Sequence, residues 1–180
     1  MVLESERKLD VAIFAGGCFW CMEPVFDAIP GVVSVIPGYT GGSTRDPSYQ
    51  EVCTGESGHV EAVRIVFDPA RVSYLELLAV FWHNIDPTTK NRQFCDFGSQ
   101  YQSAIFYLSE EQKSDAEESR RELDESKPFQ RPVVTEILPA CEFYPAEEYH
   151  HQYYRKNPQR YRMYHEGCGR AGRIKELWGG

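Results

Sequence analysis

The chain has 180 residues, of which 42% are hydrophobic and 26% are charged, and its formal net charge at pH 7 is −8. These values are typical of a soluble globular protein that can bury a sizeable core, and the acidic excess argues against a general nucleic-acid binder. No apolar stretch of the sequence has the length of a membrane span or a signal peptide. We therefore expect a cytoplasmic protein with neither nucleic-acid nor membrane partners.

Hydrophobic spacing predicts alternating strands and helices along the first 140 residues. Short apolar or alternating runs indicate five strands, at residues 11–15, 32–39, 59–67, 104–108 and 133–138. Apolar residues at helical spacing or a serine cap indicate three helices, at 18–29, 74–82 and 110–127. Ser73, followed three residues later by Glu76, matches a capping box. Polar or irregular stretches indicate two loops, at 40–47 and 86–99.

This order predicts an α+β fold. Helices would cover one face of a mixed or antiparallel sheet in a two-layer sandwich with a ferredoxin-like core. Residues 1–8 are polar and are expected to form an N-terminal arm. Residues 140–180 are aromatic and irregular, and we expect an extension that wraps the core. No linker or repeat divides the sequence, so we expect one domain over residues 1–180.

The sequence Gly-Gly-Cys-Phe-Trp-Cys at residues 16–21 joins the first predicted strand to the first helix. A thiol at a helix N-terminus faces unpaired N–H groups and the positive end of the helix dipole, and both favour its thiolate. We therefore expect Cys18 to be a nucleophile. Cys21 lies about one helical turn further on and can trap an oxidised sulfur as a disulfide. By spacing alone, such a pair is redox-active or metal-binding somewhat more often than inert.

A second segment, Gly-His-Val-Glu-Ala-Val at residues 58–63, carries an acid on a predicted strand. Glu61 shares one face of that strand with His59. Among aromatic walls the acid would be desolvated and would keep its proton for donation, although an exposed carboxylate is the better interpretation of this segment alone. Three aromatic residues can supply such walls or belong to the core: Trp20, Tyr39 and Tyr49.

A third segment, residues 95–101, places an acid, an amide and a phenol in a loop before a strand. Loops of this kind often line sites, which makes Asp96 and Tyr101 candidate site residues. The alternative is a simple turn in which Asp96 caps a local N–H group.

Two other functions fit the cysteines. A general disulfide oxidoreductase of the thioredoxin kind can use Cys18 and Cys21, but it gives Glu61 no role. A zinc-binding module can combine the same cysteines with His59 or His150, but the sequence has no second close cysteine pair.

Several motifs occur together and in a fixed order. They are GGCFWC at 16–21, GYTGG at 38–42, DPSYQEVCTG at 46–55, GHVEAV at 58–63, FDP at 67–69 and DFGSQYQSAIF at 96–106. With these motifs the chain resembles the peptide methionine sulfoxide reductases of the A type over about residues 11–158. The segment HQYYRKNP at 151–158 is similar to a later region of the same family.

The resemblance implies an enzyme that reduces the S epimer of methionine sulfoxide, free or within oxidised proteins, and so repairs them. Cys18 matches the family's nucleophile. The other site residues implied by position are Phe19 and Trp20 as walls for the sulfoxide methyl group, and Glu61, Tyr49, Tyr101 and Asp96 around its oxygen. Attack would leave a sulfenic acid on Cys18. A second thiol would convert it to a disulfide, which thioredoxin would reduce. No metal or organic cofactor is implied, and we expect a monomer.

The chain departs from the commonest family pattern in its cysteines. The residue after Trp20 is often glycine in the family but is Cys21 here, and the tail carries one cysteine, Cys168. Both Cys21 and Cys168 are therefore candidates to resolve the sulfenic acid. We favour Cys21 because it is close to Cys18 in the chain. The remaining cysteines are expected to be structural thiols: Cys53, Cys95 and Cys141.

Overall fold

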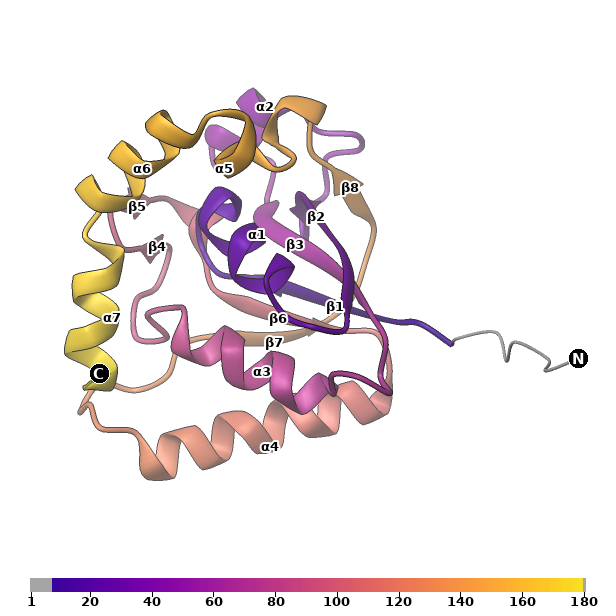
Figure 1. Ribbon diagram of the computed structural model, residues 1–180, viewed down its shortest axis with the longest axis vertical. Helices are drawn as coiled ribbons and strands as arrows, with labels where there is room; N and C mark the ends of the chain where they lie inside the picture. Colours follow the sequence, from indigo (N-terminus) through magenta and orange to yellow (C-terminus); the bar gives the residue numbers. More distant parts are fainter. Residues whose placement is uncertain (1–7, 180) are drawn as a thin grey trace, which may run out of the picture.

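The computed structural model describes residues 8–179, and six strands form one mixed sheet in the order β7-β6-β1-β3-β2-β8 (Figure 1). These strands are β1 (Asp10–Ala15), β2 (Val32–Thr40), β3 (Val60–Phe67), β6 (Ala104–Tyr107), β7 (Glu136–Pro139) and β8 (Phe143–Pro145). Neighbouring strands are antiparallel except for β6 and β7, which are parallel. Two shorter strands, β4 (Arg92–Gln93) and β5 (Asp96–Phe97), form a hairpin within the stretch predicted as a loop.

One face of the sheet is covered by α1 (Phe19–Asp27), α3 (Tyr74–His83) and α4 (Glu110–Ser126). Strand β1 shows why the layers form. Its Phe14 lies in the core under these helices and stacks on Phe81 of α3 at a ring distance of 5.0 Å, whereas Ile13 and Ala15 belong to a smaller cluster on the opposite face. The chain order β1-α1-β2-β3-α3-β6 with the strand order β6-β1-β3-β2 confirms the predicted α+β fold with a ferredoxin-like core.

Serine caps fix the starts of three helices. Ser73 accepts the N–H of Glu76 at 3.1 Å, and the Glu76 carboxylate accepts the N–H of Ser73 at 2.7 Å, which is the predicted capping box. Ser109 caps α4 by accepting an N–H three residues further on. A second capping box, Ser48 with Glu51, begins α2 (Tyr49–Cys53). The sequence pattern missed α2 because five residues are too few to show a helical period.

The C-terminal stretch, expected to be irregular, contains three helices: α5 (Tyr153–Lys156), α6 (Pro158–Gly167) and α7 (Arg170–Trp178). Two 3₁₀ turns, η1 (Ser99–Tyr101) and η2 (Glu148–His150), lie before them. The helical spacing was missed because α6 buries none of its residues and therefore has no apolar stripe. The stretch does run over the core, since β8 pairs with β2 and both α6 and α7 follow one side of the molecule (Figure 1).

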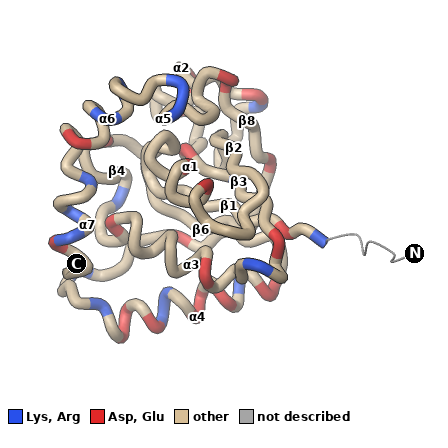
Figure 2. Tube along the Cα trace, viewed as in Figure 1, with Lys and Arg blue, Asp and Glu red and all other residues tan. Residues whose placement is uncertain are grey.

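Charged residues of both signs alternate along α4 (Figure 2), where Arg121 pairs with Glu118 and Glu125. Within residues 8–179, none of the helices is both long and apolar enough to cross a membrane. Residues 1–7 of the expected N-terminal arm lie outside the described residues.

Candidate active site

Cys18 lies at the junction between β1 and α1, as the N-cap residue of the helix. The turn before it depends on glycine. Gly17 has a φ of 84°, and a Cβ atom there would lie 2.5 Å from the side chain of Gln93. Cys18, which follows this turn, is buried, with only 7% of the residue exposed. Cys21, one turn into α1, is buried as well.

Glu61 reaches the start of α1 from the adjacent strand β3. Its Oε2 atom accepts the backbone N–H of Phe19 at 3.0 Å, so the carboxyl group caps the helix. Only 2% of the residue is exposed. Burial raises the pKa of Glu61 to about 8, and the bond from Phe19 only partly offsets this rise. Glu61 is therefore mainly a neutral acid at pH 7, as its predicted role requires.

The pKa shifts of Cys18 and Cys21 differ from the expectation that Cys18 is the thiolate. Burial raises the pKa of Cys18 well above its ordinary value, and the hydrogen bond with Cys21 and the charge of Glu61 raise it further. The same hydrogen bond lowers the pKa of Cys21, and the nearby Arg170 guanidinium also lowers it. The expectation that the helix N-terminus makes Cys18 the thiolate is wrong, because Glu61 occupies the N–H of Phe19 and burial outweighs the dipole. Of the two thiols, Cys21 is therefore the one that loses its proton more readily.

The other oxygen-bearing candidates come from three elements and meet near Glu61. Tyr49 begins α2, Tyr101 ends η1 and Asp96 begins β5. Burial raises the pKa of both phenols, and the charge of Glu61 acts in the same direction on each. Both phenols are therefore neutral hydrogen-bond donors. Burial also raises the pKa of Asp96, while the Tyr164 hydroxyl that donates to its carboxylate lowers it.

The aromatic candidates Phe19 and Trp20 are held by residues of the C-terminal stretch. The Trp20 ring stacks on Tyr153 at a centroid distance of 3.9 Å and an angle of 6°. Its Nε1–H donates to Nδ1 of His150 at 3.0 Å. The Phe19 ring lies 5.0 Å from the His150 ring and 5.8 Å from Tyr39. The walls of the site therefore depend on residues far away in the sequence.

Sequence reasoning missed these supporting residues. Glu147 accepts the Tyr39 hydroxyl and the N–H of Tyr49, each at 3.0 Å, and so joins β2 to α2. Arg170 is buried, with 4% of the residue exposed, and its guanidinium donates to the carbonyl of Gly16 at 2.9 Å. The density of aromatic residues after position 140 was the available signal, but it carries no information on which ring each one meets.

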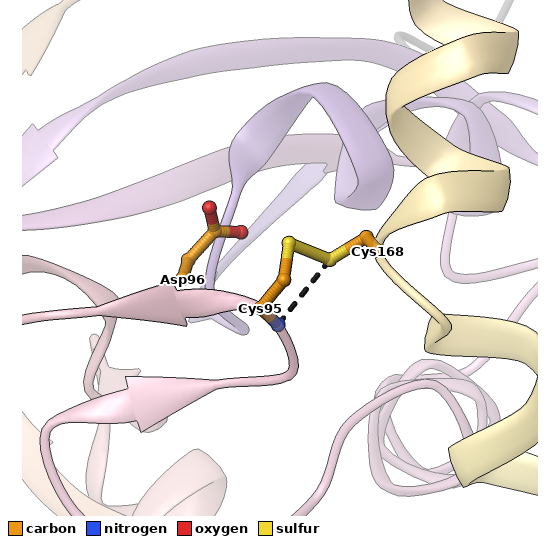
Figure 3. A group of neighbouring side chains, drawn as sticks. All are labelled: Cys95, Asp96 and Cys168. Atoms are coloured by element: carbon orange, nitrogen blue, oxygen red, sulfur yellow. Dashed lines mark hydrogen bonds between the residues drawn. A yellow bond between two sulfur atoms is a disulfide. The ribbon is translucent and has the colours of Figure 1, made fainter.

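The disulfide state corrects another expectation. Cys95, expected to be a structural thiol, forms a disulfide with Cys168, the second candidate for resolving the sulfenic acid (Figure 3). Within the described part of the chain, the remaining cysteines are free: Cys18, Cys21, Cys53 and Cys141. Cys21 is thus the free thiol that stands beside Cys18.

His59 has a structural position. Its Nδ1 accepts the N–H of Gly42 at 3.1 Å and its Nε2 contacts the carbonyl of Thr44 at 2.7 Å, which fixes the glycine-rich loop after β2. In residues 8–179, the group of potential metal ligands that come close together is Cys95, Asp96 and Cys168, and its two sulfurs are bonded to each other. This arrangement gives no support to a zinc site at Cys18 and Cys21.

A pair of cysteines at the start of a helix, beside a neutral carboxylic acid, is typical of a thiol-dependent oxidoreductase. The chain belongs to the peptide methionine sulfoxide reductase family, whose family model matches residues 10–180. The peptide methionine sulfoxide reductase MsrA of Bacillus subtilis is 53% identical over 175 residues, covering 97% of this chain and 98% of the relative. The chain is therefore an enzyme that reduces methionine sulfoxide.

Solved structures agree on the fold. Methionine sulfoxide reductase A of Corynebacterium diphtheriae has a TM-score of 0.75 at 34% identity over 88% of this chain and 79% of its own. Reduced Mxr1 from Saccharomyces cerevisiae has a TM-score of 0.80 at 31% identity, covering 86% and 89%. Mxr1 in complex with Trx2 has a TM-score of 0.58 at 21% identity, covering 82% and 88%, a likeness that shows the fold alone.

Proposed function

We propose that this enzyme reduces methionine S-sulfoxide, free or in oxidised proteins, by attack of Cys18 on the sulfoxide sulfur while Glu61 protonates the oxygen. The observation that carries the proposal is the buried Glu61 carboxyl group. It is a neutral acid with a pKa of about 8, and it accepts a hydrogen bond from the N–H of Phe19, the residue that follows Cys18. Sulfoxide oxygen leaves only when protonated, so an acid at this point provides what the reaction needs.

The neighbouring residues fit the substrate. Sulfur and methyl groups pack favourably against aromatic rings, so Phe19 and Trp20 can orient the sulfoxide sulfur towards Cys18. Tyr49 and Tyr101 are neutral phenols beside Glu61, and they can donate hydrogen bonds to the oxygen as negative charge develops there. In this proposal, the charge of Asp96 helps keep Glu61 protonated, because it raises the pKa of Glu61.

The hydrogen-bonded pair of sulfurs accounts for the proton that Cys18 must lose. In this proposal Cys21, whose pKa is lowered, is the thiolate of the pair. As Cys18 attacks, its sulfur bonds to the sulfoxide sulfur and its proton passes to Cys21, while Glu61 gives its proton to the oxygen. The protonated oxygen then moves as a hydroxyl group to the Cys18 sulfur. The substrate's sulfur–oxygen bond and the new bond between the two sulfurs break, so methionine leaves and Cys18 is a sulfenic acid. Cys21 then returns its proton to Glu61 and attacks the Cys18 sulfur. This second step forms the Cys18–Cys21 disulfide, and the departing hydroxide takes the proton from Glu61 and leaves as water.

We propose Cys21 as the resolving residue because it lies one helical turn from Cys18 in α1 and its sulfur is hydrogen-bonded to the Cys18 sulfur. An external dithiol then reduces the Cys18–Cys21 disulfide by exchange. Cys21 lines a cavity of about 650 Å³ between α1 and α7, which gives a reductant a route to it. Thioredoxin is the dithiol we propose, since the similar Mxr1 forms a complex with Trx2.

These steps use thiols and side-chain acids, so we propose that no metal or organic cofactor takes part. One chain supplies all the groups named, which supports a monomer that works as one catalytic domain. Reduced thioredoxin is kept in reducing compartments, and this chemistry favours the cytoplasm.

A single-turnover reaction tests the proposal. Reduced enzyme is mixed with racemic methionine sulfoxide in excess and without reductant, and its disulfides are mapped by mass spectrometry. We expect one methionine per chain and a new Cys18–Cys21 disulfide. With dithiol present, consumption should stop at about half of the racemate, because each enzyme type serves one epimer. Oxidation that bypasses Cys18, or full consumption of the racemate, would refute the assignment.

A further inference from the structure

Two neighbouring contacts join α6 to the hairpin of β4 and β5. The first is the Cys95–Cys168 disulfide, and the second is the hydrogen bond that the Tyr164 hydroxyl donates to Asp96. Tyr164 and Cys168 are four residues apart and so lie on one face of the helix, and their partners Cys95 and Asp96 are neighbours in the hairpin. Figure 3 shows Asp96 beside the disulfide, which crosses from the hairpin to the C-terminal end of α6. We call these four residues the clamp.

The clamp holds Tyr164 over the active site. The edge of the Tyr164 ring meets the Trp20 ring at 5.9 Å and 87°. Asp96, which accepts the Tyr164 hydroxyl, is a candidate site residue whose charge acts on Glu61. With α6 in this position, Cys18 and Glu61 are almost completely buried. A sulfoxide must contact both groups to react, so α6 has to move before a peptide can bind.

The elements on both sides of α6 are anchored independently of the clamp. Before it, Tyr153 of α5 stacks on Trp20. After it, Arg170 donates to the carbonyls of Gly16 and Asn84 at 2.9 and 3.0 Å. Helix α6 itself buries no residue. It begins at Pro158, directly after the non-helical Asn157, and it is followed by Gly169, whose backbone is in the left-handed region. It is therefore a weakly packed helix between two fixed points, and such elements open at low cost.

We propose that the Cys95–Cys168 disulfide is a redox-controlled lock that keeps α6 closed over Cys18, so that its reduction opens the site to methionine sulfoxide in polypeptides. The inference rests on the proposed role of Cys18. A disulfide in a protein that works among reduced thiols fits a regulatory bond, since such bonds are usually transient or redox-sensing.

The chemistry of opening follows from exposure. Cys95 is exposed, so the thiolate of an external dithiol attacks its sulfur, and Cys168 leaves as a thiolate. The backbone N–H of Cys95 lies 3.3 Å from the Cys168 sulfur and can stabilise that charge. The second thiol of the reductant then attacks its own mixed-disulfide sulfur and releases Cys95. The clamp gains two thiols and the dithiol becomes a disulfide, so the reductant class that recycles Cys18 also opens the site.

The test uses full-length Cys21→Ser protein, in which Cys18 cannot be consumed by a bond to residue 21. Mass spectrometry verifies that the Cys95–Cys168 disulfide is present, and Cys95→Ser is added in a second protein to remove it. Cys53→Ser, which removes an exposed free cysteine, is the matched control. Two rates are measured without reductant: alkylation of Cys18 by iodoacetamide, and single-turnover reduction of a peptide containing methionine sulfoxide.

We expect both rates to rise about tenfold or more when the disulfide is absent, because a larger fraction of the molecules then has α6 open. Both rates should stay unchanged in the Cys53→Ser control. Equal rates with and without the disulfide would overturn the lock. Faster alkylation without any sulfoxide turnover would support the lock. The same reaction in protein that keeps Cys21 as the proton acceptor then decides the role of Cys18, and absence of turnover there would refute it. Selective reduction of the disulfide in the Cys21→Ser protein repeats the comparison without a second substitution, so a folding defect cannot imitate the result.

Discussion

The substitution Glu61→Gln separates the acid role of Glu61 from its structural role. A glutamine keeps an oxygen that can accept the N–H of Phe19, so the start of α1 should stay intact. It lacks the proton that the carboxyl group donates. The pKa rise from 4.5 to about 8 corresponds to roughly 5 kcal/mol in favour of the protonated form. At pH 7, about nine in ten molecules then carry the proton.

Loss of general acid catalysis typically costs about 10²- to 10⁴-fold in rate. We expect the single-turnover formation of methionine by Glu61→Gln to slow by a factor in this range. The wild-type rate should fall as the pH rises through about 8, since the acid is then lost, and this fall should be absent in the variant. Rapid mixing followed by chromatography of methionine measures both. Glu56→Gln, an exposed glutamate five residues earlier, is the control.

Two results would contradict the acid role of Glu61. An unchanged rate in Glu61→Gln would remove Glu61 from the reaction. A wild-type rate that keeps rising through pH 8 would show that ionisation of Cys18 limits the reaction and that no acid is needed.

Three other predictions follow from the supporting residues. Arg170→Met leaves the carbonyl of Gly16 without its donor, so thermal unfolding should show a loss of about 2–4 kcal/mol; an unchanged melting temperature would contradict this. Glu23 has its pKa raised to about 7, chiefly by burial, so it stabilises the fold below pH 4.5 and this stabilisation is lost as the pH rises through about 7. Urea unfolding of Glu23→Gln should lack that decline, and an identical pH dependence would be evidence against it. His150→Phe removes the acceptor of the Trp20 indole N–H, so the KM for sulfoxide should rise severalfold while thiol alkylation of Cys18 changes little; an unaltered KM would count against this support of the wall.

The strands and helices up to β6 could be predicted because their signals are local. The alternation of side chains between the two faces of β3 involves only a few consecutive residues, and so does the capping box of Ser73 and Glu76. The helices of the C-terminal stretch had no such signal, since α6 carries no buried face and owes its place to Tyr164 and Cys168. Contacts between distant residues decide such elements, and a single sequence does not show them.

The candidate site shows the same division. Cys18 and Glu61 were identified from motifs, but the pKa of each depends on burial and on the groups around it, such as the Phe19 N–H that Glu61 accepts. Only the folded chain defines these surroundings. The partner of Cys95 lies 73 residues away, and no local pattern pairs these cysteines.

Trapping the sulfenic acid shows directly whether Cys18 takes the oxygen from methionine sulfoxide. Cys21→Ser protein is treated with methionine sulfoxide and then with dimedone, which labels sulfenic acids, and the labelled peptide is identified by mass spectrometry. We expect one methionine released per chain and a label on Cys18 alone. A label on a different cysteine, or methionine formed by a Cys18→Ser variant, would contradict it.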